Sequence, residues 1–226
     1  MKILAFRVWG PYAHFRRVYT TTSASTYSFP PRTAIVGLIG AILGIPSKPR
    51  AFHLRELKDL RVAVALEKSV DKTRIPVNLV SIKDDRRRIQ IPLEVIKDPV
   101  YKVYVSDENF EKFEMLEKLL KHREAMYTPY LGISEFIASF EYLGTYQANV
   151  ASTPTNVVSV VRTSLAEIAF EKGCLYLTER TTREMDENRK YVSYETYILS
   201  AEAKPIKLKN AEVELFKVGD EVIMWL

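Results

Sequence analysis

Residues 12–46 have the sequence YAHFRRVYTTTSASTYSFPPRTAIVGLIGAILGIP, which predicts a polar loop leading into a buried helix. Pro31 suits the first turn of a helix, where its missing N–H would have no partner in any case. The apolar run that follows predicts a helix over 32–44. Gly37, Gly40 and Gly44 are three and four residues apart and share one helical face, which predicts close packing of that face on a neighbouring backbone.

Positive charge is concentrated at this end of the chain. The first 55 residues contain eight lysines and arginines and no aspartate or glutamate, whereas the whole chain of 226 residues has a formal net charge of only +5. The remaining residues are therefore net negative. A local excess of positive charge indicates a local anionic partner.

The composition is that of an ordinary soluble protein, with 47% hydrophobic and 27% charged residues. The single cysteine, Cys174, excludes an internal disulfide and a cysteine-rich metal site. Arg7 interrupts the N-terminal apolar run too early for a secretory signal, and the apolar run 34–45 is shorter than the roughly 20 residues that span a bilayer. We therefore predict a cytoplasmic location and no membrane partner. Few glutamines and many charged residues favour a thermophilic source.

Hydrophobic periodicity in the first 145 residues predicts the order β-α-β-β-α-β. The expected helices are 32–44 and 108–122, and the expected strands are 3–9, 60–67, 100–105 and 135–143. This order is that of the ferredoxin-like fold, which RNA-recognition modules share. We therefore predict an α+β fold with a ferredoxin-like domain over 1–145.

Two further parts are expected: one between the strands of this pattern and one after it. Pro76 and Pro92 flank an Asp-Asp-Arg-Arg-Arg centre, which predicts a protruding hairpin with its tip near 84–88. From 146 onward no helical pattern is convincing, and strands are expected at 157–162, 174–182, 191–199, 211–217 and 221–226. We predict a smaller β-rich lobe over 146–226.

The opening loop combines cations, hydroxyls and aromatic rings. Cations neutralise phosphates, rings stack on bases, and a helix N-terminus offers unbonded N–H groups to an anion. The RNA-binding residues predicted here are Tyr12, Phe15, Arg16, Arg17, Tyr27, Phe29, Arg32 and Thr33. The alternative is a solvated loop whose aromatic rings fill the core.

The charged centre of the hairpin is a second candidate contact with a phosphate backbone. Its predicted RNA-binding residues are Lys83, Arg86, Arg87 and Arg88. Asp84 and Asp85 lie beside them, so a solvated charged face remains the alternative.

Signals for catalysis are weaker. No two histidines have metal-ligand spacing, and the glycine-rich helix lacks the Lys-Ser/Thr of a phosphate-binding loop, so we predict no metal and no cofactor. Metal-free RNA cleavage needs only a base, an acid and a cation. The candidates for such a set are Tyr12, His14, Tyr27, Lys121 and His122, for each of which a structural role is the favoured alternative.

The runs FRR at 15–17 and TYSFPPRTAIVGLIGAILGI at 26–45 resemble one known family. It is Cas family five, the CRISPR-associated RAMP subunits of type I Cascade effector complexes. The runs PLEVIKDPVYKVYV at 92–105 and YLGISEF at 130–136 extend the resemblance over most of the first 140 residues.

The resemblance implies a ferredoxin-like RAMP domain with a thumb hairpin at about 72–98. It also implies that 12–33 hold the 5′ handle of crRNA, that the thumb contacts the backbone RAMP subunit, and that the Cascade large subunit and DNA lie nearby in an antiviral complex. One branch of the family cleaves pre-crRNA with a Lys-His pair before a Leu-Gly turn. Lys121 and His122 precede Leu131 too closely to match that pair. We therefore predict an RNA-binding subunit that is not an enzyme, with a metal-independent endoribonuclease that processes pre-crRNA as the alternative.

Overall fold

An antiparallel four-stranded sheet organises the N-terminal half of the chain in the computed structural model, which describes residues 1–18, 24–80, 88–106 and 110–226. Its strands have the order β3-β6-β1-β7. They are β1 (Lys2–Trp9), β3 (Arg61–Leu66), β6 (Val100–Ser106) and β7 (Ser139–Gln147). The expected helices are present between them as α1 (Arg32–Leu43) and α3 (Phe110–His122), and a short helix, α2 (Phe52–Glu56), follows α1.

Strand β1 is buried on both faces. Leu4, Phe6 and Val8 belong to the same buried cluster as the apolar residues of α1 and α3. Ile3 and Ala5, which point the other way, pack with apolar residues of the last strands of the chain. The incomplete alternation of β1 follows from this burial on two sides, since neither face has to be polar.

Helix α1 forms where the sequence predicts it. Six of its aliphatic side chains are buried, and each contributes about 2 kcal/mol, which exceeds the cost of about 1 kcal/mol for each glycine. The glycine face packs closely, but against side chains and not against a backbone as the sequence predicts: a Cβ added to Gly40 would lie 2.8 Å from His53 Cβ. Gly44 ends the helix in the left-handed region, with φ of 76°.

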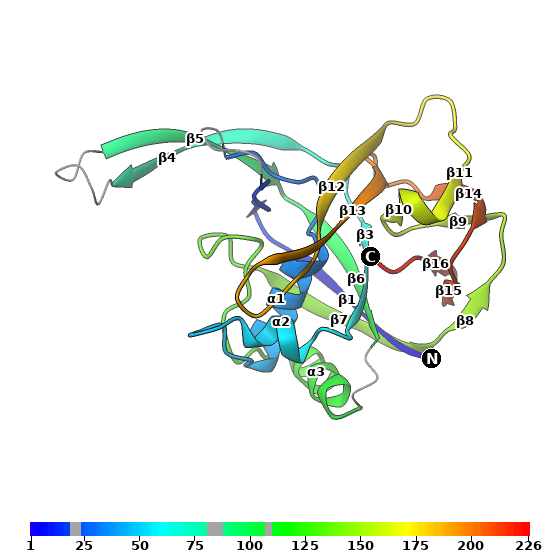
Figure 1. Cartoon of the computed structure of the whole chain (residues 1–226), viewed down its shortest axis with the longest axis horizontal. Coiled ribbons are helices and arrows are strands. Elements are labelled where there is room, and N and C mark those ends of the chain that lie inside the picture. Colours follow the sequence, from blue (N-terminus) through cyan, green and yellow to red (C-terminus); the bar gives the residue numbers. More distant parts are fainter. Residues whose placement is uncertain (19–23, 81–87, 107–109) are drawn as a thin grey trace.

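Strands β4 (Lys72–Val80) and β5 (Arg88–Lys97) form an antiparallel ribbon that extends away from the rest of the protein (Figure 1). We call this ribbon the arm. Its register pairs Pro76 with Pro92 and continues to Val80 opposite Arg88. The expected tip lies in 81–87, outside the described residues. At its base, β5 pairs with the short strand β2 (Tyr12–Ala13), which ties the arm to the opening loop.

The C-terminal part is made of strands and one short 3₁₀ helix. They are β8 (Asn149–Ala151), β9 (Thr155–Val157), β10 (Val161–Arg162), η1 (Thr163–Leu165), β11 (Ala166–Ile168), β12 (Tyr176–Met185), β13 (Tyr191–Ser200), β14 (Ile206–Ala211), β15 (Leu215–Val218) and β16 (Glu221–Ile223). The long ribbon formed by β12 and β13 crosses α1 (Figure 1). Its turn is held against the start of α2, where Ala51 N donates to Glu187 O.

Three strand predictions are wrong. The strand expected at 157–162 is divided between β9 and β10, which belong to different sheets, because Val158 N and Val160 N donate to Val222 O and Val64 O of other strands. The strand expected at 135–143 begins only at Ser139, because Leu131 N donates to Phe136 O and closes a turn there. The strand expected at 211–217 is divided between β14 and β15, which pair with different neighbours. The chain is thus a β-rich α+β protein. No helix in its described part is long and apolar enough to cross a membrane.

Candidate nucleic-acid interface

Two adjoining cavities of about 280 and 240 Å³ open over the first turns of α1. We call them together the α1 groove and define it by the five residues that line both: Thr33, Ala34, His53, Gly132 and Arg189. These residues come from α1, α2, the loop before β7 and the turn of the β12–β13 ribbon. Four segments far apart in sequence therefore build one concave surface.

The floor of the groove is the start of α1. Thr33, Ala34 and Gly37 lie on it, and a Cβ at Gly37 would only reach ordinary contact with His53 Nε2, at 3.9 Å. The helix has Pro31 as its N-cap, no side-chain cap and no acidic residue in its first turn. The positive end of the helix dipole therefore meets no anion from its own first turn, which favours an anionic ligand at this point.

Two arginines add positive charge to the rim. Arg16 and Arg189 both line the cavity over Pro31, and both are exposed. Neither forms an ion pair with a described residue. Arg17 and Arg55, by contrast, are bonded to glutamates. The charges of Arg16 and Arg189 therefore remain available for phosphate.

Two exposed tyrosines line the larger of the two cavities together with Arg189. Tyr127 is 53% exposed and Tyr130 is 46% exposed, and both line the larger cavity. Backbone N–H groups of Met126 and Tyr127 donate to Ile42 O and Ala41 O, so this segment is bonded to the last turn of α1. Exposed aromatic rings beside uncompensated cations are what single-stranded nucleic acids bind.

A close backbone contact positions the loop that carries Tyr130. His14 N donates to Leu131 O at 3.0 Å. Gly132 adopts φ of +95°, and a Cβ there would lie 1.9 Å from His14 O. Only glycine fits at this position, which accounts for the Leu-Gly pair in the sequence.

Two histidines line the cavity over Pro31. His14 is only 3% exposed, and its Nδ1 lies 2.7 Å from Glu94 O. Since a carbonyl oxygen can only accept, Nδ1 carries the proton and Nε2 is left as an acceptor. Burial lowers the pKa of His14 and also that of His53, to which Arg189 contributes as well. Both rings are therefore neutral near pH 7.

Three aromatic residues predicted to stack on bases belong to the core. Phe15, Tyr27 and Phe29 are 4%, 3% and 0% exposed. The ring of Phe15 packs edge-on against Tyr101, and that of Phe29 against Tyr197. The prediction of base stacking by these three is wrong, because no ring face is open to a base; the alternative of rings filling the core is the correct one for them.

Arg17 and Arg32 are also engaged within the chain. Arg17 Nη2 donates to the buried carboxylate of Glu179 at 2.7 Å. Arg32 Nη2 donates to Lys58 O and Leu60 O at 2.7 and 2.8 Å, and burial lowers its pKa. Both side chains join distant segments rather than presenting a free charge to phosphate.

The remaining predicted residues are dispersed. Of the loop residues, Arg16 and Thr33 line the α1 groove, whereas the Tyr12 ring packs 5.7 Å from that of Phe136. Arg88 is exposed at the start of β5, far along the arm. Lys83, Arg86 and Arg87 lie outside the described residues. The predicted set therefore does not form a single site.

The candidate catalytic pair on α3 lies apart from the groove. Lys121 Nζ is 2.9 Å from Glu117 Oε1, and this contact raises the pKa of the lysine. His122 Nδ1 lies 2.8 Å from Lys118 O at the end of the helix. Both are bonded within their own helix, as the structural alternative expects.

A larger cavity of about 520 Å³ is lined by Arg32, but its charges largely cancel. Its acidic residues are Asp59, Glu184, Glu212 and Glu214, and its basic residues are Arg32, Lys58, Arg61, Arg162 and Arg183. Arg162 is bonded to Glu195 and Arg183 to Glu184. This cavity suits a polyanion less well than the smaller α1 groove does.

Sequence reasoning missed four residues of the groove region: His53, Tyr127, Tyr130 and Arg189. The run Tyr-Thr-Pro-Tyr-Leu-Gly at 127–132 could have indicated Tyr127 and Tyr130, because two tyrosines around a proline are typical of an exposed turn. No signal pointed to Arg189, because only the fold of the β12–β13 ribbon brings its turn to α2.

Comparison with known proteins shows the family. The sequence matches the model of CRISPR-associated protein (Cas_Cas5) over residues 3–196. It is 30% identical over 150 residues to the CRISPR pre-crRNA endoribonuclease Cas5d of Thermus thermophilus, a match that spans 62% of this chain and 64% of the relative. The chain thus spans less than two thirds of the relative's length. The prediction that it is not an enzyme is corrected, since this relative is named as an endoribonuclease.

Solved structures share the fold at low sequence identity. A CRISPR protein from Archaeoglobus fulgidus has a TM-score of 0.63 at 12% identity, covering 99% of this chain and 98% of that chain. A chain of a CRISPR RNA-guided surveillance complex has a TM-score of 0.53 at 15% identity, covering 91% of each. Together with the family match over most of the sequence, this means that the chain belongs to the Cas5 family of CRISPR-associated proteins.

Proposed function

We propose that this protein binds the repeat-derived 5′ handle of crRNA in the α1 groove, as a subunit of a crRNA-guided complex. The observation that carries the proposal is the combination in one groove of Arg16, Arg189, Tyr127, Tyr130 and an uncapped helix N-terminus. The titles of structural neighbours, an RNA-guided surveillance complex and a type III-B complex bound to target RNA, support an RNA-containing assembly.

The proposed ligand is a single strand rather than a duplex. Rings stack only on bases that are already unpaired, and the wide minor groove of an RNA duplex is recognised mainly through phosphates and 2′-hydroxyls. Cavities of about 280 and 240 Å³ admit a base or a phosphate but not a helix. The exposed tyrosines therefore favour unpaired nucleotides.

The arm and the domain division belong to the same proposal. The sheet order β3-β6-β1-β7, with α1 and α3 in the crossovers, supports a ferredoxin-like domain over 1–145 with the arm as its thumb and a β-rich lobe over 146–226. Val77 and Ile91 pair on one face of the arm, and Asn78 and Gln90 on the other. The apolar face suits the backbone subunit of a cytoplasmic Cascade complex, while the large subunit and DNA would lie elsewhere on the surface.

Crosslinking tests the binding proposal directly. The full chain is mixed with repeat RNA that carries 4-thiouridine at single positions, irradiated, digested and analysed by mass spectrometry. Handle nucleotides should crosslink to peptides that contain Tyr127, Tyr130 or His53. Crosslinks confined to the C-terminal strands, or equal yields with a scrambled RNA, would contradict the proposal.

A second function, cleavage of pre-crRNA without a metal ion, is favoured by the two histidines of the groove and by the name of the relative. In such cleavage a base accepts the 2′-hydroxyl proton, the 2′-oxygen attacks phosphorus and the 5′-oxygen leaves with a proton from an acid. His14 Nε2 has the tautomer of a base, and Arg16 lies beside it to stabilise the phosphorane charge.

Incubating pre-crRNA with the protein in EDTA tests this second function. We expect cuts at one position in each repeat that are lost in His14→Asn, whose side-chain N–H can still donate to Glu94 O. His122→Asn, on α3, serves as the control and should cut normally. Absence of cuts by the wild-type protein would leave binding alone as its function.

A further inference from the structure

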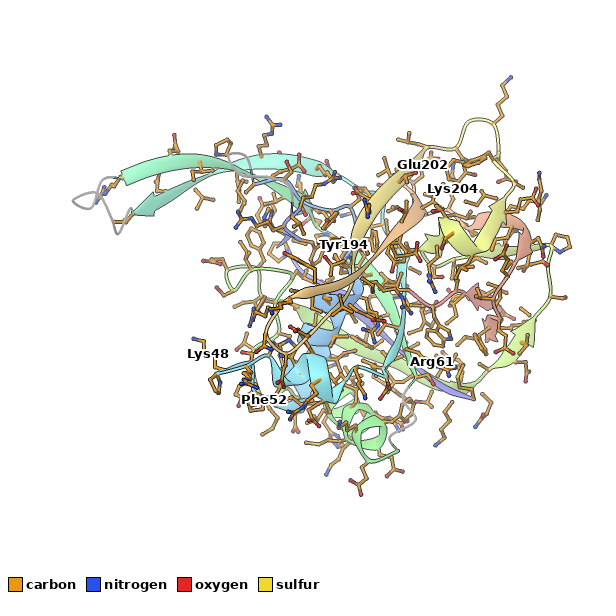
Figure 2. The ribbon with its side chains drawn as sticks, viewed as in Figure 1. Lys48, Phe52, Arg61, Tyr194, Glu202 and Lys204 are labelled. Atoms are coloured by element: carbon orange, nitrogen blue, oxygen red, sulfur yellow. The ribbon has the colours of Figure 1, made fainter. Side chains whose placement is uncertain are left out.

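The outer face of the β12–β13 ribbon carries exposed aromatic rings that no part of the proposed site uses. Tyr191 is 48% exposed and Tyr194 is 37% exposed. Figure 2 shows Tyr194 midway along the ribbon. Glu202 and Lys204 lie farther along the chain, just past the end of β13. Residues of the opposite, inner face, such as Glu179 and Thr181, are buried against the first half of the chain.

These rings form a stack with a cation at one end. The ring centroids of Tyr191 and Tyr194 lie 5.7 Å apart with planes inclined by 32°. The guanidinium carbon of Arg180 lies 5.4 Å from the centroid of Tyr194. Arg180 is exposed and forms no ion pair with a described residue. The three side chains hold one another in place, so little rotamer freedom is lost when a planar ligand adds to the stack.

The outer face of the β12–β13 ribbon carries positive charge. The three glutamates of its strands are each bonded to an arginine: Glu179 to Arg17, Glu184 to Arg183 and Glu195 to Arg162. In the turn, Glu187 is paired with Arg50 and Arg55, and Asp186 Oδ1 accepts from the backbone N–H groups of Asn188 and Lys190. Arg180 thus keeps its charge on the outer face, and Lys190 is exposed beside Tyr191. This face offers rings and positive charge, which complements a single-stranded polyanion.

The ribbon is continuous with the α1 groove. Arg189, in the turn, lines the groove, and Tyr191, two residues later, begins β13. Tyr191 and Tyr194 are therefore the first two rings along β13 for a strand that leaves the groove past Arg189.

We infer that the stack of Tyr191, Tyr194 and Arg180 is a second RNA-binding site, which takes one or two unpaired bases of the same strand whose handle lies in the α1 groove. The inference rests on the proposed function for the identity of the strand. The rings provide stacking that is independent of base identity, and Arg180 meets the adjoining phosphate.

Binding of fluorescein-labelled single-stranded repeat RNA to the full chain tests this inference by fluorescence anisotropy. Tyr191→Thr with Tyr194→Thr removes both rings and keeps good strand-forming residues. We expect an affinity about ten-fold lower with an unchanged slope of log affinity against log salt, since no charge is lost. Tyr191→Phe with Tyr194→Phe, the matched control, should bind within about two-fold of the wild-type protein, because stacking is kept.

Three results would overturn the inference. The first is that the double threonine variant binds RNA with wild-type affinity while Arg16→Ala binds it more weakly. In that case only the proposal of RNA binding in the α1 groove would remain. The second is unchanged RNA affinity together with loss of a co-purifying protein, which would make this face a protein contact. The third is no binding of RNA by the wild-type protein, which would remove the proposed function as well. Crosslinking of 4-thiouridine to Tyr191 or Tyr194 in the wild-type protein gives a readout free of any folding defect.

Discussion

The guanidinium of Arg17 and the carboxylate of Glu179 form a 2.7 Å ion pair that joins the opening loop to the β12–β13 ribbon. The Glu179 side chain is 4% exposed and also accepts from Ser28 Oγ at 2.7 Å. Lys72, at the base of the arm, lies 3.8 Å away. Three segments that build the α1 groove and its surroundings are thus tied to one buried carboxylate.

Replacing Glu179 by glutamine should therefore destabilise the protein. The change removes the buried negative charge that both Arg17 and Lys72 face, which costs about 3 kcal/mol, at the low end for buried pairs because Arg17 is partly exposed. Urea unfolding measures the free energy. Glu202→Gln removes an exposed partner of Lys204 and should leave the free energy of unfolding nearly unchanged. Equal effects of the two substitutions would show that Glu179 is not a central tie.

Gly132→Ala should be more damaging than an ordinary glycine substitution. The new Cβ would lie 1.9 Å from His14 O, in addition to the strain of φ at +95°, so we expect a loss of at least about 2 kcal/mol and weaker RNA binding. At Gly173, φ is +85° and no atom lies within 4 Å of the added Cβ, so Gly173→Ala should cost about 1 kcal/mol. Thermal unfolding of the two variants compares them, and a smaller loss at Gly132 would refute the close contact.

Stability should fall as pH decreases from about 7 to 5. Burial lowers the pKa of His14, with Arg16 acting in the same direction and Glu94 against it. The unfolded chain takes up a proton near pH 6.5, whereas the folded His14 resists it, so the unfolded state binds more protons in this range. The free energy of unfolding of His14→Asn should be less pH-dependent between 7 and 5. A curve parallel to that of the wild-type protein would mean that His14 titrates alike in both states.

The arm should be needed for assembly but not for folding. Val77 and Ile91 pair on its apolar face, so Val77→Asp places a charge where a neighbouring subunit is proposed to pack. We expect loss of co-purification with the backbone subunit and an unfolding midpoint within about 2 °C of the wild-type value, since the arm extends away from the core. Asn78→Asp, on the other face, should co-purify normally. Assembly by Val77→Asp would exclude this face as the contact.

The sequence predicts the elements whose signals are local. Pro31 and Gly44 bracket α1 within a residue, because proline at the start and glycine at the end act through their own backbones. The arm is likewise predicted from local signals, the two prolines Pro76 and Pro92 on either side of a charged centre. The sequence does not predict the short strands β8 and β11, since strands of three residues depend on partners far along the chain.

The site is less predictable than the fold. Arg17 and Arg16 are adjacent and chemically identical, yet Arg17 is bonded to a carboxylate 162 residues away, whereas Arg16 lines the groove. Aromatic residues in a basic loop likewise fit a binding surface or a core, and burial of Tyr27 and Phe29 decides for the core. Only tertiary structure distinguishes these alternatives, because each depends on what the rest of the chain brings near.

The salt dependence of RNA binding tests the central claim, that the α1 groove holds single-stranded RNA through Arg16 and Arg189. Affinity for repeat RNA is measured between about 50 and 400 mM KCl, a range wide enough to give the slope of log affinity against log salt. In the Arg16→Ala, Arg189→Ala double variant, the slope of log affinity against log salt should be shallower by about 1.4, which corresponds to two lost phosphate contacts. Lys209→Ala, an exposed lysine beside Glu167, should keep the wild-type slope. A wild-type slope in the double variant would contradict the claim.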